Sequence, residues 1–262
     1  MPDSSKAKAE TAPEPREIHR VIREEGEGQI ERHSGAVAWS GLSAGLSMGF
    51  SFLTMAVLQA ALPDAPWRSL VSGFGYTLGF LIVILGRQQL FTESTLTPVL
   101  PVLTGPSWDK LPKLLLFWAV VLSTNLVGTW LFAWGICHDW LFKPELWQAL
   151  REIASEAVEN PFWPTLIKAV LAGWLIALMV WLLPSAGSAK VLIIVILTYV
   201  VAIGHFSHSI AGSVEGAFAV LAGDHGLGAY FMGFLFPTVL GNTIGGVALV
   251  ALLNHAPLAT EA

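Results

Sequence analysis

The chain alternates long apolar stretches with short polar segments, and six of the stretches are long enough to cross a bilayer. They lie near residues 36–62, 70–103, 114–136, 162–183, 190–222 and 227–253. A transmembrane helix needs about 20 apolar residues. The second and fifth stretches are each interrupted by a polar run, at residues 86–95 and 204–213. Irregular polar backbone cannot face lipid, because nothing there satisfies its N–H and C=O groups, so the runs predict a protein-enclosed cavity or pore.

A short motif recurs at a similar distance after each polar run. The third stretch contains Asn125-Leu-Val-Gly128 and the sixth contains Asn242-Thr-Ile-Gly245. From Thr92 to Asn125 is 33 residues (125 − 92), and from His208 to Asn242 is 34 (242 − 208). The alternative is chance recurrence in helices rich in glycine. The spacing favours two halves of three spans, about 34–137 and 160–255, and an odd number of spans inverts the second half in the membrane.

These patterns predict an all-α integral membrane protein with six transmembrane helices, an inverted 3+3 repeat and broken second and fifth helices. Composition agrees, because 54% of the residues are hydrophobic, only 13% are charged and the mean hydropathy is +0.63. The single Cys137 excludes an internal disulfide framework, and no Cys/His spacing typical of zinc occurs. Glycines and serines at four-residue spacing in the first, second and sixth stretches favour close helix packing.

Charged residues outside the spans predict the orientation. Residues 1–33 form a polar stretch interpreted as a tail, in which residues 17–23 are alternatively a surface helix, and residues 256–262 form a second tail. Nine Lys and Arg flank the spans on the side of both termini and three flank them on the other side. The positive-inside rule therefore predicts cytoplasmic termini, and we expect a multi-pass protein of a bacterial inner membrane. The expected surroundings are lipid, with no nucleic-acid partner.

Several ionisable side chains fall within or at the ends of the apolar stretches, where an ionised group is costly unless paired or hydrated. They are Arg87, Glu93, Lys168, His205, His208 and Glu215. Arg87 and Glu93 either contact a solute or pair with each other and cap the broken ends. Lys168 either attracts anions to an entrance or snorkels to the interface. Glu215 either caps the second half of its helix or lies near the outer interface.

His208 is the sharpest candidate, because it lies within the fifth-span interruption. A neutral imidazole donates from one nitrogen and accepts at the other, which suits handling a small acid. His205 lies three residues earlier and, if helical, on nearly the same face. The alternative for either histidine is a helix–helix hydrogen bond. No carboxylate completes a metal site with the pair, so no metal or other cofactor is expected.

At the interruptions the chain resembles the formate/nitrite transporter family. The matching pieces, which together span about residues 30–255, are Leu90-Phe91-Thr92, Phe206-Ser-His208-Ser-Ile-Ala211, Trp174-Leu-Ile-Ala-Leu-Met-Val-Trp181 and Phe236-Pro-Thr-Val-Leu-Gly-Asn-Thr-Ile-Gly-Gly246. The resemblance implies an aquaporin-like fold in a homopentamer, with one pore per protomer for small monovalent anions or their acids.

The resemblance also implies roles for individual residues. His208 matches the central histidine, Thr92 the threonine of the facing loop, and Leu90 and Phe91 the apolar constriction beside it. Further constriction positions, on the cytoplasmic side, match Phe80 and Val201. Three residues depart from the family pattern: Gly173 and Gly212 stand where asparagine is common, and Ser207 stands where glutamate is frequent. Arg87, Glu93 and His205 are added polar groups.

Moving an anion through an apolar constriction is opposed by desolvation, and protonation removes most of that cost. We therefore expect a weak-acid anion to gather near Lys168, gain a proton near His208 and cross as a neutral molecule. One alternative is a channel for a neutral solute, although the Asn-Pro-Ala pair typical of aquaporins is absent. The other is an intramembrane enzyme using His205, His208 and Glu215, for which no nucleophile or metal set is present. A non-enzymatic channel or transporter is the preferred interpretation.

Overall fold

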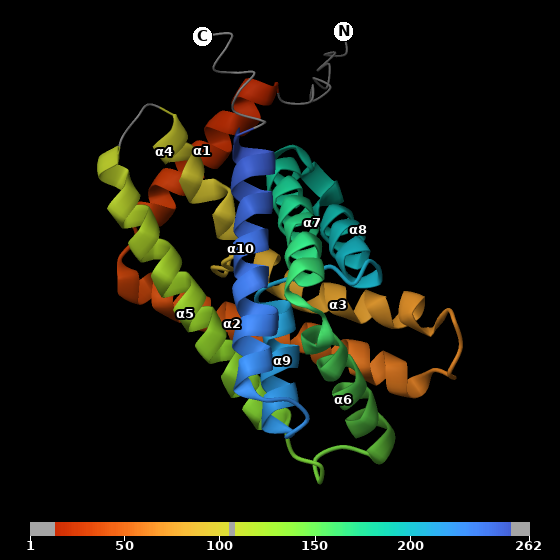
Figure 1. Cartoon of the computed structure of the whole chain (residues 1–262). Coiled ribbons are helices and arrows are strands. Elements are labelled where there is room, and N and C mark those ends of the chain that lie inside the picture. Colours follow the sequence, from red (N-terminus) through yellow and green to blue (C-terminus); the bar gives the residue numbers. More distant parts are fainter. Residues whose placement is uncertain (1–13, 105–107, 253–262) are drawn as a thin grey trace, which may run out of the picture.

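The computed structural model describes residues 14–104 and 108–252, and the regular elements in this part of the chain are all helical (Figure 1). The α-helices are α1 (Pro15–Glu31), α2 (Ser34–Ala61), α3 (Arg68–Leu85), α4 (Leu100–Leu103), α5 (Leu111–Ile136), α6 (Pro144–Glu159), α7 (Phe162–Leu182), α8 (Lys190–Ile203), α9 (Ala211–Leu221) and α10 (Phe236–Ile244). Short 3₁₀ turns occupy Glu93–Thr95, Thr97–Val99, Trp108–Lys110, Leu183–Ser185 and Gly187–Ala189. Wider π-helical turns at Ala229–Leu235 and Gly245–Leu252 flank α10.

The predicted membrane fold is confirmed. Five helical segments are long and apolar enough to span a bilayer: Ser34–Ala61, Arg68–Leu85, Leu111–Ile136, Phe162–Ser185 and Ala229–Ala248. The interrupted fifth stretch is divided into α8 and α9, and the second stretch continues after α3 as 3₁₀ turns and α4. Both breaks therefore fall where polar residues replace the apolar pattern.

Helix packing repeats between the two halves of the chain. Helix α2 packs on α5, and α7 packs on α10. In the first pair a Cβ added to Gly45 would overlap the backbone of Asn125, and in the second pair a Cβ added to Gly173 would overlap the backbone of Asn242. Gly173, which departs from the family pattern noted above, therefore has a packing role at the helix crossing.

Helix α1 is longer than the surface helix considered for residues 17–23, and one of its faces is buried against the rest of the molecule. Its contacts are with Thr97–Val99 and α4, and it buries Ile22, Gly26 and Ile30. Gly26 lies so close to the carbonyl of Thr97 that a side chain would not fit. Helix α1 thus covers one end of the molecule, which we call the α1 end.

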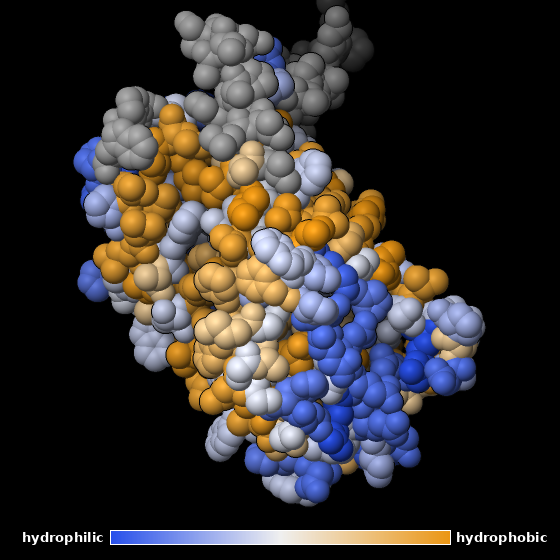
Figure 2. Space-filling view, viewed as in Figure 1, coloured by the Kyte–Doolittle hydropathy of each residue, from blue (hydrophilic) through white to orange (hydrophobic). Residues whose placement is uncertain are grey.

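The opposite end carries α6, an amphipathic helix over which hydrophilic residues gather (Figures 1 and 2). Ion pairs attach it to both halves of the chain. Arg68, the first residue of α3, lies 3.8 Å from Glu152, and Arg151 pairs with Asp224 after α9. The hydrogen bond from Arg151 holds the pKa of Asp224 below its usual range. We call this the α6 end.

Candidate functional site

Each interrupted span bends at a segment that we call an elbow: residues 86–91 form the first and residues 204–209 the second. Helices α3 and α8 end in the same way, at Gly86 and Gly204. The next residues, Arg87 (φ 50°) and His205 (φ 48°), both adopt the left-handed conformation that side chains rarely take. A non-glycine residue is held there only when surrounding structure fixes it.

Main-chain hydrogen bonds show that the two elbows have the same local fold. The N–H of Gln88 donates to the carbonyl of Val83 at 2.9 Å, five residues earlier. The N–H of Phe206 donates to the carbonyl of Val201 at 3.0 Å, again five residues earlier. The backbone geometry is therefore duplicated although the side chains differ.

A buried asparagine fixes the first elbow. Asn125 of α5 accepts a hydrogen bond from the N–H of Phe91 (2.9 Å) and donates to the carbonyls of Gln89 (2.9 Å) and Gly41 (2.7 Å). Its side chain is fully buried. The amide thus satisfies elbow groups that have no helical partner, which low-dielectric surroundings require.

Asn242 makes the equivalent three bonds in the second elbow. It accepts from the N–H of Ser209 (2.8 Å) and donates to the carbonyls of Ser207 (2.9 Å) and Ala169 (2.8 Å). We call Asn125 and Asn242 the asparagine clamps. Their matching contacts support the inverted repeat inferred from the recurrence of Asn and Gly.

The clamps correct the residue correspondence assumed from sequence. They pair Gln89 with Ser207 and Phe91 with Ser209, so the counterpart of His208 is Leu90 rather than Thr92. The chain distances are 34 residues from Phe91 to Asn125 and 33 from Ser209 to Asn242 (125 − 91 and 242 − 209). The spacing along the chain alone therefore gives a register between the two halves that is wrong by two residues.

The geometry of His208 defines which ring nitrogen carries a proton in the neutral side chain. Its Nδ1 accepts hydrogen bonds from the N–H groups of Ile210 (3.3 Å) and Ala211 (3.2 Å), at the start of α9. The proton of the neutral ring is therefore on Nε2. That Nε2 is buried and has no hydrogen-bond partner among the described residues. A donor held in this way is available to a solute or water.

The N-terminus of α9 adds to the polarity of this point. Helix N-termini carry a partial positive charge, and half-helices that begin at membrane depth favour anionic groups there. Thr92 lies close by, because its Oγ1 is 3.0 Å from the Oγ of Ser209 and 3.5 Å from Oδ1 of Asn242. Thr92 is therefore placed beside the second elbow, through Ser209, the neighbour of His208.

The four predicted apolar residues, Phe80, Leu90, Phe91 and Val201, belong to one buried cluster. Phe80 of α3 presents its ring to His208, with centroids 5.0 Å apart and planes nearly perpendicular. Leu90 is completely buried, and Phe91 packs towards Trp118 of α5. Val201 lines a cavity at the α6 end. Its expected place on the cytoplasmic side stays a prediction, as does the orientation of the chain in the membrane.

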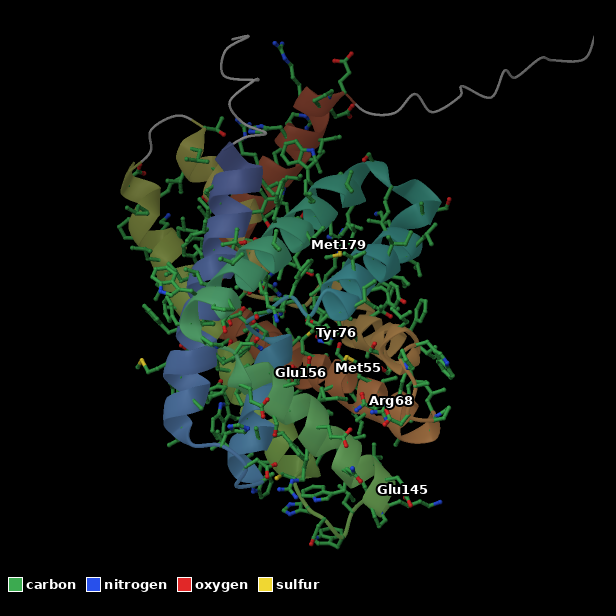
Figure 3. All side chains as sticks on the ribbon, turned by 45° about the vertical axis from the view of Figure 1, so that its right-hand side comes forward. Met55, Arg68, Tyr76, Glu145, Glu156 and Met179 are labelled. Carbon is green, nitrogen blue, oxygen red and sulfur yellow. The ribbon has the colours of Figure 1, made fainter. Side chains whose placement is uncertain are left out.

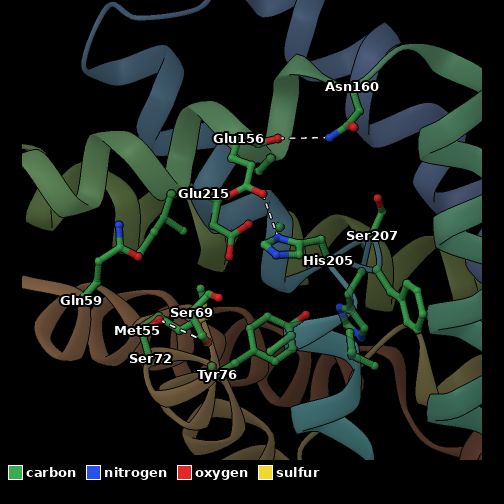
Figure 4. A pocket seen from close by; sticks show the side chains of 18 of the residues that line it. Met55, Gln59, Ser69, Ser72, Tyr76, Glu156, Asn160, His205, Ser207 and Glu215 are labelled. Atoms are coloured by element: carbon green, nitrogen blue, oxygen red, sulfur yellow. Dashed lines mark hydrogen bonds and ion pairs between the residues drawn. The ribbon is translucent and has the colours of Figure 1, made fainter. Parts of the chain in front are cut away.

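The cavity at the α6 end has a volume of about 130 Å³ and reaches His208. We call it the α6-side cavity (Figures 3 and 4). Glu156 of α6, His205 and Ser207 of the second elbow and Glu215 of α9 line it. Lys168 lies beside it, where its Nζ donates to Oδ1 of the lining residue Asn160 (3.3 Å). The second polar run thus contributes both histidines to one cavity.

A larger cavity of about 690 Å³ lies at the α1 end. Arg87 and Glu93 both line it, together with residues of α1 such as Glu25. No hydrogen bond or ion pair joins Arg87 to Glu93 in the part of the chain that the structure describes, so the alternative in which they pair with each other is not observed. One carboxylate oxygen of Glu93 is buried without a partner in that same part.

Sequence reasoning missed Ser209 and the contacts made by the two asparagines. Ser209 holds Thr92 through its hydroxyl and binds Asn242 through its N–H. The recurrence of Asn125 and Asn242 in the sequence predicts a repeat, and it also marks the two residues that make these contacts. Within the described residues, no group of three or more His, Cys, Asp or Glu side chains is arranged to hold a metal ion.

Comparison with known proteins decides the family. Residues 16–256 match the family model described as "Formate/nitrite transporter". The chain belongs to the formate/nitrite transporter family. It is 39% identical over 244 residues to the inner membrane protein YfdC of Escherichia coli K12, covering 93% of this chain and 79% of YfdC. It is 24% identical over 265 residues to the formate channel FocA of the same strain, covering 91% and 92%.

A solved structure of a pentameric formate channel with formate bound has a similar fold. The TM-score is 0.72 at 21% identity, and the match covers 86% of this chain and 98% of that one. At this identity the likeness establishes a shared fold.

Proposed function

We propose that this chain is a membrane channel for small monovalent anions or their conjugate weak acids, with passage linked to protons through His208. The observation that carries the proposal is the buried Nε2 of His208, which has no partner among the described residues and belongs to a side chain that lines the α6-side cavity. The N-terminus of α9 holds the other ring nitrogen, Nδ1, and the hydroxyl group of Thr92 meets that of Ser209, the chain neighbour of His208. A helix that begins at membrane depth favours a small anion there.

Passage then proceeds in three steps. A weak-acid anion enters the cavity near Lys168 and His205 and meets the Nε2–H of His208. It gains a proton at that point through water, or from the histidine as the ring takes a replacement proton from water, because the neutral acid passes an apolar segment far more easily than the anion. The buried side chains of Phe80, Leu90 and Phe91 form the apolar segment. Enzymatic chemistry is not part of the proposal.

Uptake by proteoliposomes tests the function. Formate, nitrite, hydrosulfide, lactate and acetate would be offered separately between about pH 5 and 8, with glycerol as a neutral solute. Faster uptake of at least one of the weak acids at acidic pH, without chemical change in the solute, is the expected result. Glycerol flux with no flux of any weak acid would overturn the proposal and favour a neutral-solute channel.

Two variants test the role of His208. His208→Phe keeps an aromatic ring but removes the Nε2–H, so weak-acid uptake is expected to fall about tenfold to hundredfold, or about 1.4–2.7 kcal/mol of barrier. His205→Phe is the matched control and is expected to have a smaller effect. Unchanged uptake and an unchanged pH profile in a correctly assembled His208→Phe variant would remove His208 from the mechanism.

Assembly and orientation are part of the proposal. The pentamer of the formate channel with the same fold supports a homopentamer with one pore per protomer. Native mass spectrometry in detergent is expected to give five copies, and a stable monomer or tetramer would contradict this. The excess of Lys and Arg supports cytoplasmic termini in an inner membrane. Labelling of cysteines introduced near either terminus, from one side of sealed vesicles at a time, tests this orientation.

A further inference from the structure

The α6-side cavity contains more acidic charge than an entrance for anions requires. Two carboxylates line it, Glu156 from α6 and Glu215 from α9, and His205 stands between the elements that carry them (Figure 4). Because all three side chains line this one cavity, a small anion inside it is close to each of these groups.

Glu156 and His205 form a hydrogen-bonded pair. Nδ1 of His205 donates to Oε1 of Glu156 at 2.8 Å, and both side chains are half exposed or more. The hydrogen bond from His205 and the charges of His205 and Lys168 hold the pKa of Glu156 below its usual range. Glu156 therefore keeps its negative charge, and His205 is the member of the pair that can gain a proton.

Glu215 is the unusual member of the group. It makes no hydrogen bond or ion pair with any residue in the described part of the chain, and yet it lines the cavity that reaches His208. Its carboxylate faces Tyr76 of α3 across the same cavity. A carboxylate without a partner repels an anion that approaches it when it is ionised, and it ceases to do so when it is protonated.

The remaining charged residues near the cavity belong to α7 and to the start of α3 with its surroundings. Lys168 of α7 is bound to Asn160, and at the rim Arg68 pairs with Glu152 and Asp64. Counting Glu156, Glu215, Lys168 and His205, the cavity has a net charge of −1 with a neutral histidine (−1 − 1 + 1 + 0). Protonation of His205 and Glu215 changes it to +1 (−1 + 0 + 1 + 1).

We propose that Glu215, together with the Glu156–His205 pair, is a specificity-determining charge filter. It admits small anions from the α6 end when the cavity has taken up protons and excludes them when it has not. This inference rests on the proposed function and deepens it, because it identifies residues that set the pH at which the anion reaches His208. The filter acts before the step at His208 and is separable from it.

Formate uptake from the α6 side tests the filter. Glu215→Gln keeps the size of the side chain and removes its charge, so uptake at about pH 9 is expected to rise on the order of tenfold and the dependence on external pH to flatten. Glu145→Gln is the matched control, because Glu145 lies at the other end of α6, away from the cavity (Figure 3). It is expected to keep the wild-type pH profile.

Glu156→Gln gives a second, more exposed position. It removes one negative charge from the same cavity and is expected to raise uptake at about pH 7.5 several-fold. If Glu215→Gln does not assemble, this variant tests the charge filter in its place. Correctly assembled Glu215→Gln or Glu156→Gln with wild-type uptake at every pH would overturn the filter. Absence of weak-acid uptake by the wild-type protein at any pH would instead overturn the proposed function.

Discussion

The two elbows have the same backbone and different chemistry. Each begins after a helix-ending glycine, passes through one left-handed residue and is bound by an asparagine that makes three hydrogen bonds. At the central position the first elbow has Leu90 and the second has His208. The difference teaches that the helix-ending glycines and the asparagine clamps set the backbone of each break, whereas the side chain at its centre sets its chemistry.

The surroundings of the elbows differ in the same way. The left-handed residue of the first elbow, Arg87, lines a cavity of about 690 Å³ at the α1 end. The left-handed residue of the second, His205, lines a cavity of about 130 Å³ at the α6 end and is bound to Glu156. Two elbows with the same backbone thus border two cavities of unequal size.

The largest expected effect is on the clamps themselves. Asn125→Ala and Asn242→Ala each remove three hydrogen bonds and leave buried backbone groups without partners, so each is expected to destabilise the protein by about 3–5 kcal/mol. Thermal unfolding in detergent measures this, with Gln148→Ala on the surface of α6 as the control. A large loss in only one of the two variants would show that the elbows are not held equivalently.

The next effect concerns the glycines beneath the clamps. Gly45→Ala and Gly173→Ala place a Cβ against the backbone of the adjacent asparagine, and overpacking of this kind costs about 1–3 kcal/mol. Gly135→Ala in α5 is the control, because its Cβ would meet no atom within 4 Å. Unfolding of the three variants under one condition tests whether Gly173 matches Gly45. Equal stability of Gly173→Ala and Gly135→Ala would deny the packing role.

A smaller effect separates the two left-handed residues. Arg87→Gly relieves an unfavourable φ but gives the unfolded chain more freedom, so its stability is expected to stay within about 1 kcal/mol of the wild type. His205→Gly also loses the hydrogen bond to Glu156 and is expected to be about 1 kcal/mol less stable than Arg87→Gly. Arg87→Val, which is strained at this φ, provides the contrast. A His205→Gly variant more stable than Arg87→Gly would contradict the assignment of that bond.

The smallest effect concerns the attachment of α6 to each half. Arg151→Gln, on the second half, and Arg68→Gln, on the first, are each expected to lose about 0.2–1 kcal/mol at about pH 7, because exposed ion pairs contribute little. The pKa of Asp224 is lowered in the folded protein, so its contribution is present above its unfolded pKa and is lost as the pH falls through the folded value. Unfolding at about pH 7 and about pH 3 should therefore show a difference between wild type and Arg151→Gln that shrinks on acidification.

The spans and both interruptions could be predicted from the sequence. A helix that crosses the hydrocarbon has to be long and apolar, and irregular backbone at membrane depth has to be enclosed by protein. The sequence also identified His208, because an ionisable ring at membrane depth is costly and usually belongs to a functional site. It did not give the register of the repeat, because the register depends on where each elbow bends. Nor did it show that Glu215 and Glu156, from helices far apart in the chain, share one cavity.

The clamps have a consequence for how such a chain changes over evolutionary time. Their amides bind main-chain groups of residues 89, 91, 207 and 209, and no side chain at the intervening positions takes part. Replacing Leu90 or His208 consequently leaves the bonds of the clamps in place, although Leu90 is buried and His208 also accepts the first N–H groups of α9. A gene of this kind can alter the centre of an elbow by a single codon replacement, while the residues that set the course of its backbone stay the same.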